Sequence, residues 1–305
     1  MRVVLIPTGK MERKALAASL LNIFPDVEFE CEPPDGTPDS LLPNSFTSST
    51  LPSKVHSAAE QNVDKLVRWL VATVEPGRKG RSKPALVILV EDLELANVTQ
   101  PEVVQRELSA AVQRHIERLR ADPRRVLDPD LVAQALRERA SFHLMVPMTE
   151  SYFFGDPMAL AQATPRAGDA RLMPGADVED FQVTDPAFLL PLPPGAACPH
   201  SADNHCPWDG EDRSRHPKKY VQYLNRSEQE PFCTNYKETQ QGVAGLRALR
   251  WKNVLTEPNA APYARALIED IAQAIDVECP VDNSARDRGP TSIFRRPPAL
   301  VLRNL

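Results

Sequence analysis

One uninterrupted apolar run, Ala85-Leu-Val-Ile-Leu-Val90, constrains the fold of this chain more than any other feature. It lies between Pro84 and the acidic segment Glu91-Asp-Leu-Glu94. Strands that are buried on both faces read as continuous apolar runs of this kind, and they belong to parallel sheets covered by helices. The run therefore predicts a central strand of an α/β sheet.

Strand-like and helix-like segments alternate around that run over residues 1–165. Short apolar or alternating runs predict strands, and apolar residues at helical spacing predict helices. The expected strands are 3–7, 27–31, 85–90 and 142–147, and the expected helices are 11–24, 54–74, 101–120 and 131–139. This order predicts an open, mostly parallel, Rossmann-like sheet with right-handed crossovers and flanking helices.

The character of the chain changes after residue 165. The whole sequence contains 30 Pro and only 12 Gly, which favours stiff and extended connections. Further helices are expected at 217–224, 239–254 and 260–275. We therefore expect an α/β domain at 1–165, a Pro-rich, mainly helical extension containing Cys and His at 166–280 that packs on it, and an extended tail at 281–305.

The net charge and the cysteine content limit the functions and the cellular compartment that we expect for this chain. The net charge of −5 excludes a polycation, so nucleic-acid binding requires a local basic patch or a bridging metal ion. No segment approaches the roughly 20 apolar residues of a membrane span. Five Cys make a poor disulfide framework in a chain of 305 residues. We expect a cytoplasmic protein with reduced cysteines and no membrane contact.

Acidic residues follow three of the predicted strands. Glu12 comes after the first strand, Asp92 and Glu94 after the central one and Glu150 after the fourth. Because ligands of open α/β sheets bind beyond the carboxyl ends of the strands, we expect these side chains to converge there. Carboxylate oxygens are preferred ligands of Mg²⁺ and Mn²⁺, and two such ions can clamp the oxygens of a phosphodiester. The alternative is that these residues are solvated caps.

Four segments resemble, in the same order, the bacterial Toprim-like family catalogued as domain of unknown function 4276. They are Gly9-Lys-Met-Glu12, Met148-Thr-Glu-Ser-Tyr-Phe-Phe-Gly-Asp156-Pro-Met-Ala-Leu160, His216-Pro-Lys-Lys219-Tyr-Val-Gln-Tyr-Leu and Tyr236-Lys-Glu-Thr-Gln-Gln-Gly242. Toprim is the metal-binding fold of topoisomerases, primases and overcoming-lysogenization-defect nucleases. The resemblance implies a Toprim-like sheet, with Mg²⁺ or Mn²⁺ held by Glu12, Asp92 and Glu94 and catalysis by Glu12 and Glu150.

The chain departs from the Toprim pattern at two positions. Thr8 stands where a Glu usually precedes the turn Gly, and Asp92-Leu-Glu94 replaces Asp-x-Asp. A hydroxyl carries neither the charge nor the base function of the missing carboxylate. Two functions follow: a metal-dependent nucleic-acid phosphodiesterase in which Glu12 or Glu150 substitutes, or a catalytically degenerate subunit acting as scaffold or sensor. The resemblance also implies a partner ATPase and a role in bacterial anti-phage defence.

A basic segment in the extension suits the binding of phosphate groups. It contains His216, Lys218 and Lys219, and Lys237 follows in the next segment of the resemblance. Lysine binds phosphate as a point charge. The alternative is that these four residues form a solvated helix face. Phosphate binding by them is therefore one of two interpretations of the sequence.

A Cys/His cluster in the same extension contains ligands that zinc accepts. Its members are Cys198, His200, His205, Cys206 and, further along the chain, Cys233. Structural zinc takes four sulfur or nitrogen ligands, often as two spaced pairs, and this spacing does not match the usual C-x-x-C form. A structural zinc site and unligated, reduced cysteines both remain open.

Overall fold

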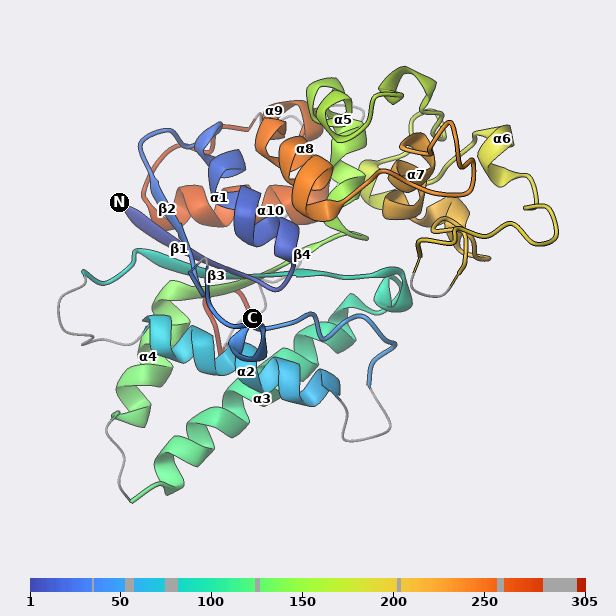
Figure 1. Ribbon diagram of the computed structural model, residues 1–305. Coiled ribbons are helices and arrows are strands. Elements are labelled where there is room, and N and C mark those ends of the chain that lie inside the picture. The colour runs from blue at the N-terminus through green and yellow to red at the C-terminus, as the bar shows by residue number, and fades with distance from the viewer. Residues whose placement is uncertain are drawn as a thin grey trace.

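The computed structural model describes residues 1–34, 36–52, 58–74, 82–123, 127–201, 204–256, 261–281 and 301–305. Its centre is a four-stranded, all-parallel, open sheet in the order β2-β1-β3-β4 (Figure 1). The strands are β1 (Arg2–Pro7), β2 (Glu28–Cys31), β3 (Leu86–Asp92) and β4 (Ala140–Met145). The predicted α/β fold class is confirmed.

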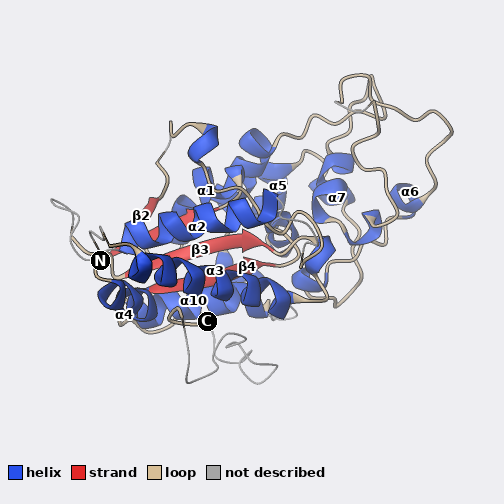
Figure 2. Cartoon of the chain, turned by 90° about the horizontal axis from the view of Figure 1, so that it is seen from below, coloured by secondary structure: helices blue, strands red, loops and turns tan. Residues whose placement is uncertain are grey.

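Helices cover both faces of the sheet (Figure 1). One face carries α1 (Lys10–Leu21), α5 (Pro157–Ala163), α8 (Val243–Ala248), α9 (Trp251–Val254) and α10 (Pro262–Ala274). The other carries α2 (Ala58–Val74), α3 (Pro101–Ala121) and α4 (Pro129–Arg139). The short α6 (Pro186–Leu189) and α7 (Pro217–Leu224) lie beyond the carboxyl ends of the strands (Figure 2). Across the described residues, no helix combines the length and the apolar content needed to cross a bilayer.

The central strand is buried on both faces, as its apolar run predicts. Leu86, Ile88 and Val90 belong to the core under α1, whereas Val87 and Leu89 belong to the core against α2 and α3. Successive side chains of a strand point to opposite faces, so an unbroken apolar run supplies both cores at once. This is why the sheet needs helices on each side.

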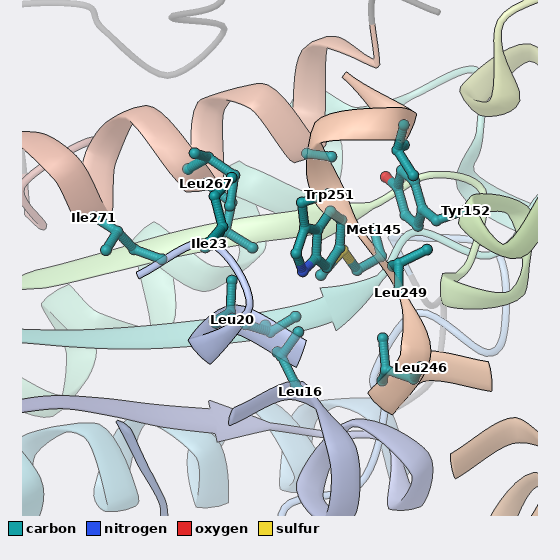
Figure 3. Packing of buried hydrophobic residues seen from close by; sticks show 14 of the residues in the cluster. Leu16, Leu20, Ile23, Met145, Tyr152, Leu246, Leu249, Trp251, Leu267 and Ile271 are labelled. Carbon is teal, nitrogen blue, oxygen red and sulfur yellow. The ribbon is translucent and has the colours of Figure 1, made fainter. Parts of the chain in front are cut away.

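The extension shares its core with the α/β domain. Trp251 of α9 is 1% exposed and packs beside Leu20, Met145 and Tyr152 (Figure 3). Its indole nitrogen donates a hydrogen bond of 2.7 Å to Ser19 Oγ of α1. On this face of the sheet the expected boundary at residue 165 therefore does not separate two hydrophobic cores.

Residues 301–305 are docked on β4, whereas we expected an extended tail over 281–305. Asn304 Nδ2 donates to the Phe142 carbonyl at 2.9 Å, and its Oδ1 accepts from the Phe142 amide at 3.0 Å. The Arg303 amide donates to the Ala140 carbonyl at 2.7 Å, and the Leu302 side chain is fully buried. An edge strand leaves backbone donors and acceptors unpaired, and this segment pairs some of them. Residues 282–300 of the expected tail lie outside the described residues.

Candidate functional site

The topology creates a crevice between the carboxyl ends of β1 and β3. These strands are neighbours, but α1 follows β1 onto one face and α3 follows β3 onto the other. Ligands of open α/β sheets bind at such a switch point. In Figure 2 the strands point toward the side that carries α6 and α7, so the extension approaches this same crevice.

The turn between β1 and α1 brings one carboxylate into the crevice. A Cβ atom at Gly9 would lie 1.7 Å from Glu12 Oε2, so the absence of a side chain at Gly9 lets the Glu12 carboxylate fold back over the start of α1. Glu12 is 4% exposed, and its Oε1 atom is buried without a hydrogen-bond partner among the described residues. Burial raises the pKa of Glu12 because the charged form loses its solvation.

The end of β3 supplies a second carboxylate, which is tied to the loop after β4. The amide and the hydroxyl of Thr149 both donate to Asp92 Oδ1 at 3.0 Å. Thr149 also hydrogen-bonds Glu12. Burial, together with the negative charges of Glu12, Glu94 and Glu150, raises the pKa of Asp92 well above its ordinary value. These four carboxylates are therefore close enough to repel one another.

Glu94 adopts a backbone conformation that is rare outside glycine. Its φ is 60° and its ψ is 151°, a region that costs about 1–3 kcal/mol for a residue with a side chain. Its amide donates to the Pro147 carbonyl at 2.8 Å, which fixes the loop after β3 against the loop after β4. Burial raises the pKa of Glu94 to about 7, although Lys218 acts in the opposite direction. Strain of this kind concentrates at functional sites.

The extension closes the crevice with a lysine and a tyrosine. Glu150 lies in the first turn of the 3₁₀ helix Thr149–Gly155, and the Tyr236 hydroxyl donates to its Oε1 at 3.2 Å. Burial raises the pKa of Glu150 to about 7, and Lys218 partly offsets this. Burial alone would lower the pKa of Lys218. The negative charges of Glu150 and of Glu238, with which Lys218 forms an ion pair, raise this pKa, so Lys218 is a cation at neutral pH.

Tight packing holds this part of the extension against α1. Gly242 ends the short π-helical segment Glu238–Gly242, and a Cβ atom there would lie 2.7 Å from both Met11 Sδ and the Tyr236 hydroxyl. Only glycine permits such an approach without displacing its neighbours. The approach places Glu238 and Tyr236 beside the first turn of α1, where Glu12 lies.

Glu91 belongs to the same acidic segment, but its side chain hydrogen-bonds the loop at residues 45–47 on the other face of the sheet. Its Oε1 atom accepts hydrogen bonds from Ser45 Oγ at 2.6 Å, the Phe46 amide at 3.0 Å and Thr47 Oγ1 at 2.7 Å. Because successive strand residues point to opposite faces, the side chains of Glu91 and Asp92 leave β3 on opposite sides of the sheet. Glu91 therefore anchors residues 45–47.

The predicted phosphate-binding residues do not form one cationic surface. Lys218 points into the carboxylates, whereas Lys219 pairs with Asp212 at 2.5 Å. Burial lowers the pKa of His216 to about 4, so its imidazole is neutral at pH 7. Lys237 is exposed. Of this group, the structure brings only Lys218 among the carboxylates of the crevice.

The structure places four expected residues, Glu12, Asp92, Glu94 and Glu150, close to one another. It adds Glu238, which was not expected from the sequence. That residue lies in the fourth segment of the resemblance, directly after Lys237, and this position was the available signal. We use the name acidic cluster for Glu12, Asp92, Glu94, Glu150 and Glu238.

The acidic cluster contains five carboxylates and one half-buried lysine, Lys218. Its oxygen donors and the unpartnered Glu12 Oε1 suit a hard divalent cation. As the side chains stand, however, no three His, Cys, Asp or Glu residues in the described part of the chain are arranged so that they could hold a metal ion. The chemistry of the donors therefore fits Mg²⁺ or Mn²⁺, and coordination requires these side chains to rotate toward a common ion.

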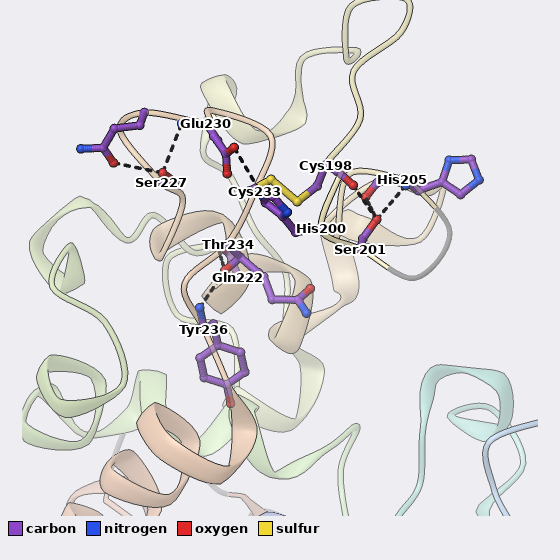
Figure 4. Close-up of a disulfide and its surroundings, with 11 residues drawn as sticks. Cys198, His200, Ser201, His205, Gln222, Ser227, Glu230, Cys233, Thr234 and Tyr236 are labelled. Carbon is purple, nitrogen blue, oxygen red and sulfur yellow. Dashed lines mark hydrogen bonds and ion pairs between the residues drawn. A yellow bond between two sulfur atoms is a disulfide. The ribbon is translucent and has the colours of Figure 1, made fainter.

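The expected zinc ligands are not gathered in the structure. Cys198 and Cys233 form a disulfide, which consumes the two thiolates that zinc would need and also departs from the expectation of reduced cysteines (Figure 4). Cys206 is buried in a separate cluster of aromatic side chains, where burial raises the pKa of its thiol. His200 and His205 are exposed, and the imidazole of His205 points away from the disulfide in Figure 4. The disulfide instead joins two loops of the extension.

Comparisons with models of protein families, with curated proteins and with solved structures found no match for this chain. The Toprim resemblance therefore stays a prediction from the four sequence segments.

Proposed function

We propose that this chain is a divalent-metal-dependent phosphodiesterase that acts on nucleic acid. The observation that carries the proposal is the convergence of Glu12, Asp92, Glu94 and Glu150 at the switch point between β1 and β3, with raised pKa values. Buried carboxylates require neutralisation, either by protons or by a cation. Perturbed pKa values of this kind cluster at functional sites.

The residues divide into metal-binding and proton-transferring groups. Glu12, Asp92 and Glu94 would hold the ion, which when bound supplies a Lewis acid for a phosphoryl oxygen and an activated water. Glu150, with a pKa of about 7 and a hydrogen bond from Tyr236, is suited to accept or donate a proton near neutral pH. Lys218 supplies the positive charge that a phosphate group needs at the same edge.

The alternative is a catalytically degenerate subunit that serves as scaffold or sensor, and one observation favours it. Lys218 provides, inside the acidic cluster, the positive charge that a metal ion would otherwise supply. Thr8, in place of a carboxylate, weakens the metal site further. In this alternative the Lys218–Glu238 pair keeps the cluster stable without metal.

A cleavage assay with a matched control distinguishes the two functions. Labelled DNA and RNA, single- and double-stranded, are incubated with Mg²⁺, with Mn²⁺ or with a chelator. We expect cleavage that needs the metal, is lost at least about 100-fold in Asp92→Asn, and survives in Asp130→Asn, whose exposed carboxylate pairs with Arg120 on the far face of the sheet.

Metal binding is measured separately by thermal denaturation. We expect Mg²⁺ or Mn²⁺ to stabilise the wild type and Asp130→Asn but not Asp92→Asn. Absence of cleavage with every substrate, together with absence of metal stabilisation, would refute the phosphodiesterase and favour the scaffold instead. The partner ATPase and the role in anti-phage defence remain predictions of the resemblance, and co-purification of the chain with an ATPase tests the first.

A further inference from the structure

A basic cleft lies on the opposite side of α1 from the acidic cluster. It has a volume of about 380 Å³ and is lined by Lys10, Arg13 and Lys14 of α1 and by Thr239. The loop after β2 adds Pro33, Pro34, Gly36, Thr37 and Leu42. Its size falls within the range of about 300–1,000 Å³ that is usual for ligand pockets. Nothing in the proposed chemistry uses this cleft.

Helical geometry explains why one helix serves both places. Residues three and four apart share a face of a helix, so Lys10, Arg13 and Lys14 form one stripe, while residues two apart do not face each other. Glu12 accordingly points away from the stripe and is buried in the acidic cluster, whereas Lys10 and Lys14 are exposed. One face of α1 therefore carries the buried Glu12 carboxylate, and another face carries the basic side chains of Lys10, Arg13 and Lys14.

The three basic side chains of the cleft differ in their contacts. The Arg13 guanidinium donates to the carbonyls of Thr8 at 3.0 Å and Pro43 at 3.2 Å, so it holds the cleft walls together. Lys10 and Lys14 form no ion pair with any residue that the structure describes. Their charges are available to a ligand, and the ligand chemistry that such charges select is anionic.

The basic cleft and the acidic cluster adjoin each other at the π-helical segment Glu238–Gly242. Thr239 lines the cleft, and its neighbour Glu238 belongs to the acidic cluster. A polyanion that approached the acidic cluster alone would be repelled, and cations beside the cluster offset that repulsion. A strand held in the cleft would continue past Thr239 toward the crevice.

We propose that the cleft formed by Lys10, Arg13 and Lys14 binds the phosphodiester backbone of the nucleic-acid strand, next to the phosphate group at the acidic cluster. This inference rests on the proposed function, since it takes the strand to be its substrate. Lys10 and Lys14 contact the phosphates, and Arg13 shapes the cleft. The cleft fixes the position of the strand without reading its sequence.

Affinity for a labelled single-stranded oligonucleotide, measured by fluorescence anisotropy with Ca²⁺ in place of Mg²⁺, tests the cleft. We expect Lys10→Gln/Lys14→Gln to weaken binding on the order of tenfold and to reduce the slope of log K against log salt by about 1.4, because each phosphate contact on a single strand contributes about 0.7. Lys83→Gln is the matched control. Lys83 is exposed and precedes β3, at the opposite end of the strands, and this variant should bind like the wild type.

Equal affinity of the double variant and the wild type overturns the inference, as does a wild type that binds no oligonucleotide. Competition by a mononucleotide as strong as that by the oligonucleotide overturns it too, because the cleft would then be a nucleotide pocket. Cleavage kinetics separate the two proposals. A raised KM with unchanged kcat in the double variant supports the cleft. Weakened binding without any metal-dependent cleavage in the wild type supports the cleft and refutes the phosphodiesterase.

Discussion

Replacing Glu150 by Gln is expected to stabilise the folded protein at pH 8 and to leave its stability nearly unchanged at pH 4.5. Glu150 is 3% exposed, and burial raises its pKa from the ordinary 4.5 to about 7. The folded state therefore holds this proton more tightly than the unfolded state does. The contribution of Glu150 to stability is most favourable at low pH and falls as the pH rises from about 4.5 through about 7, because the folded protein must give up a proton that the unfolded chain has already lost.

The structure sets the size of the effect. A pKa difference between 4.5 and about 7 corresponds to roughly 3 kcal/mol of the free energy of unfolding. Glutamine has the shape of the protonated acid and retains an oxygen to accept the Tyr236 hydroxyl, so the variant keeps the packing and loses the cost of ionisation. At pH 8 the variant should therefore exceed the wild type by up to about 3 kcal/mol.

Urea denaturation followed by tryptophan fluorescence at pH 4.5 and pH 8 measures this difference. Glu117→Gln is the control, since Glu117 is exposed on α3 on the far side of the sheet and its replacement should change stability by less than about 0.5 kcal/mol at either pH. Saturating Mg²⁺ should narrow the gap at pH 8, because a cation held by Glu12, Asp92 and Glu94 favours the ionised form of Glu150 in the wild type. A variant that is no more stable than the wild type at pH 8 would refute the claim that the acidic cluster is under electrostatic strain.

Three further predictions concern other parts of the molecule. Gly9→Ala should displace the Glu12 carboxylate, since the added Cβ would lie 1.7 Å from Glu12 Oε2; titration with Mn²⁺ should show at least about tenfold weaker binding although the protein stays folded. Replacing both Cys198 and Cys233 by Ser should lower the free energy of unfolding by about 3–4 kcal/mol, because the disulfide closes a loop with a sequence separation of 35, and unfolding that is unchanged by reductant would contradict this. Asn304→Ala should cost about 1–3 kcal/mol by leaving the Phe142 amide and carbonyl unpaired, and hydrogen exchange at Phe142 should speed up.

The sheet could be predicted from the sequence because each strand carries its own local signal. The run at 85–90 is apolar at every position, which fits a strand buried on both faces, and the observed β3 extends it only to Asp92. The expected helix at 239–254 was wrong in detail, since the chain forms the π-helical segment Glu238–Gly242 followed by α8 and α9. Local periodicity does not report the close contact at Gly242 that shapes this region.

The acidic half of the site could be predicted because parallel strands bring their carboxyl ends to one edge. The other half could not, because Lys218 and Glu238 reach the crevice through tertiary packing of the extension on α1. The same limit applies to the disulfide, since the sequence positions of Cys198 and Cys233 contain no information on which cysteines meet. Neither an unusual backbone at Glu94 nor the docking of residues 301–305 leaves a periodic signal in the sequence.

The docking of residues 301–305 on β4 has a consequence for how this protein can self-associate. An uncovered edge strand is a template on which another chain can add a strand, which is a route to aggregates and to domain-swapped dimers. On one side of the sheet this chain covers the template with its own Arg303 and Asn304, and on the other side the edge strand β2 is only four residues long and carries Glu28 and Glu30. Growth of the sheet across molecules is therefore hindered at both borders, which favours complexes built through the helices or through the extension.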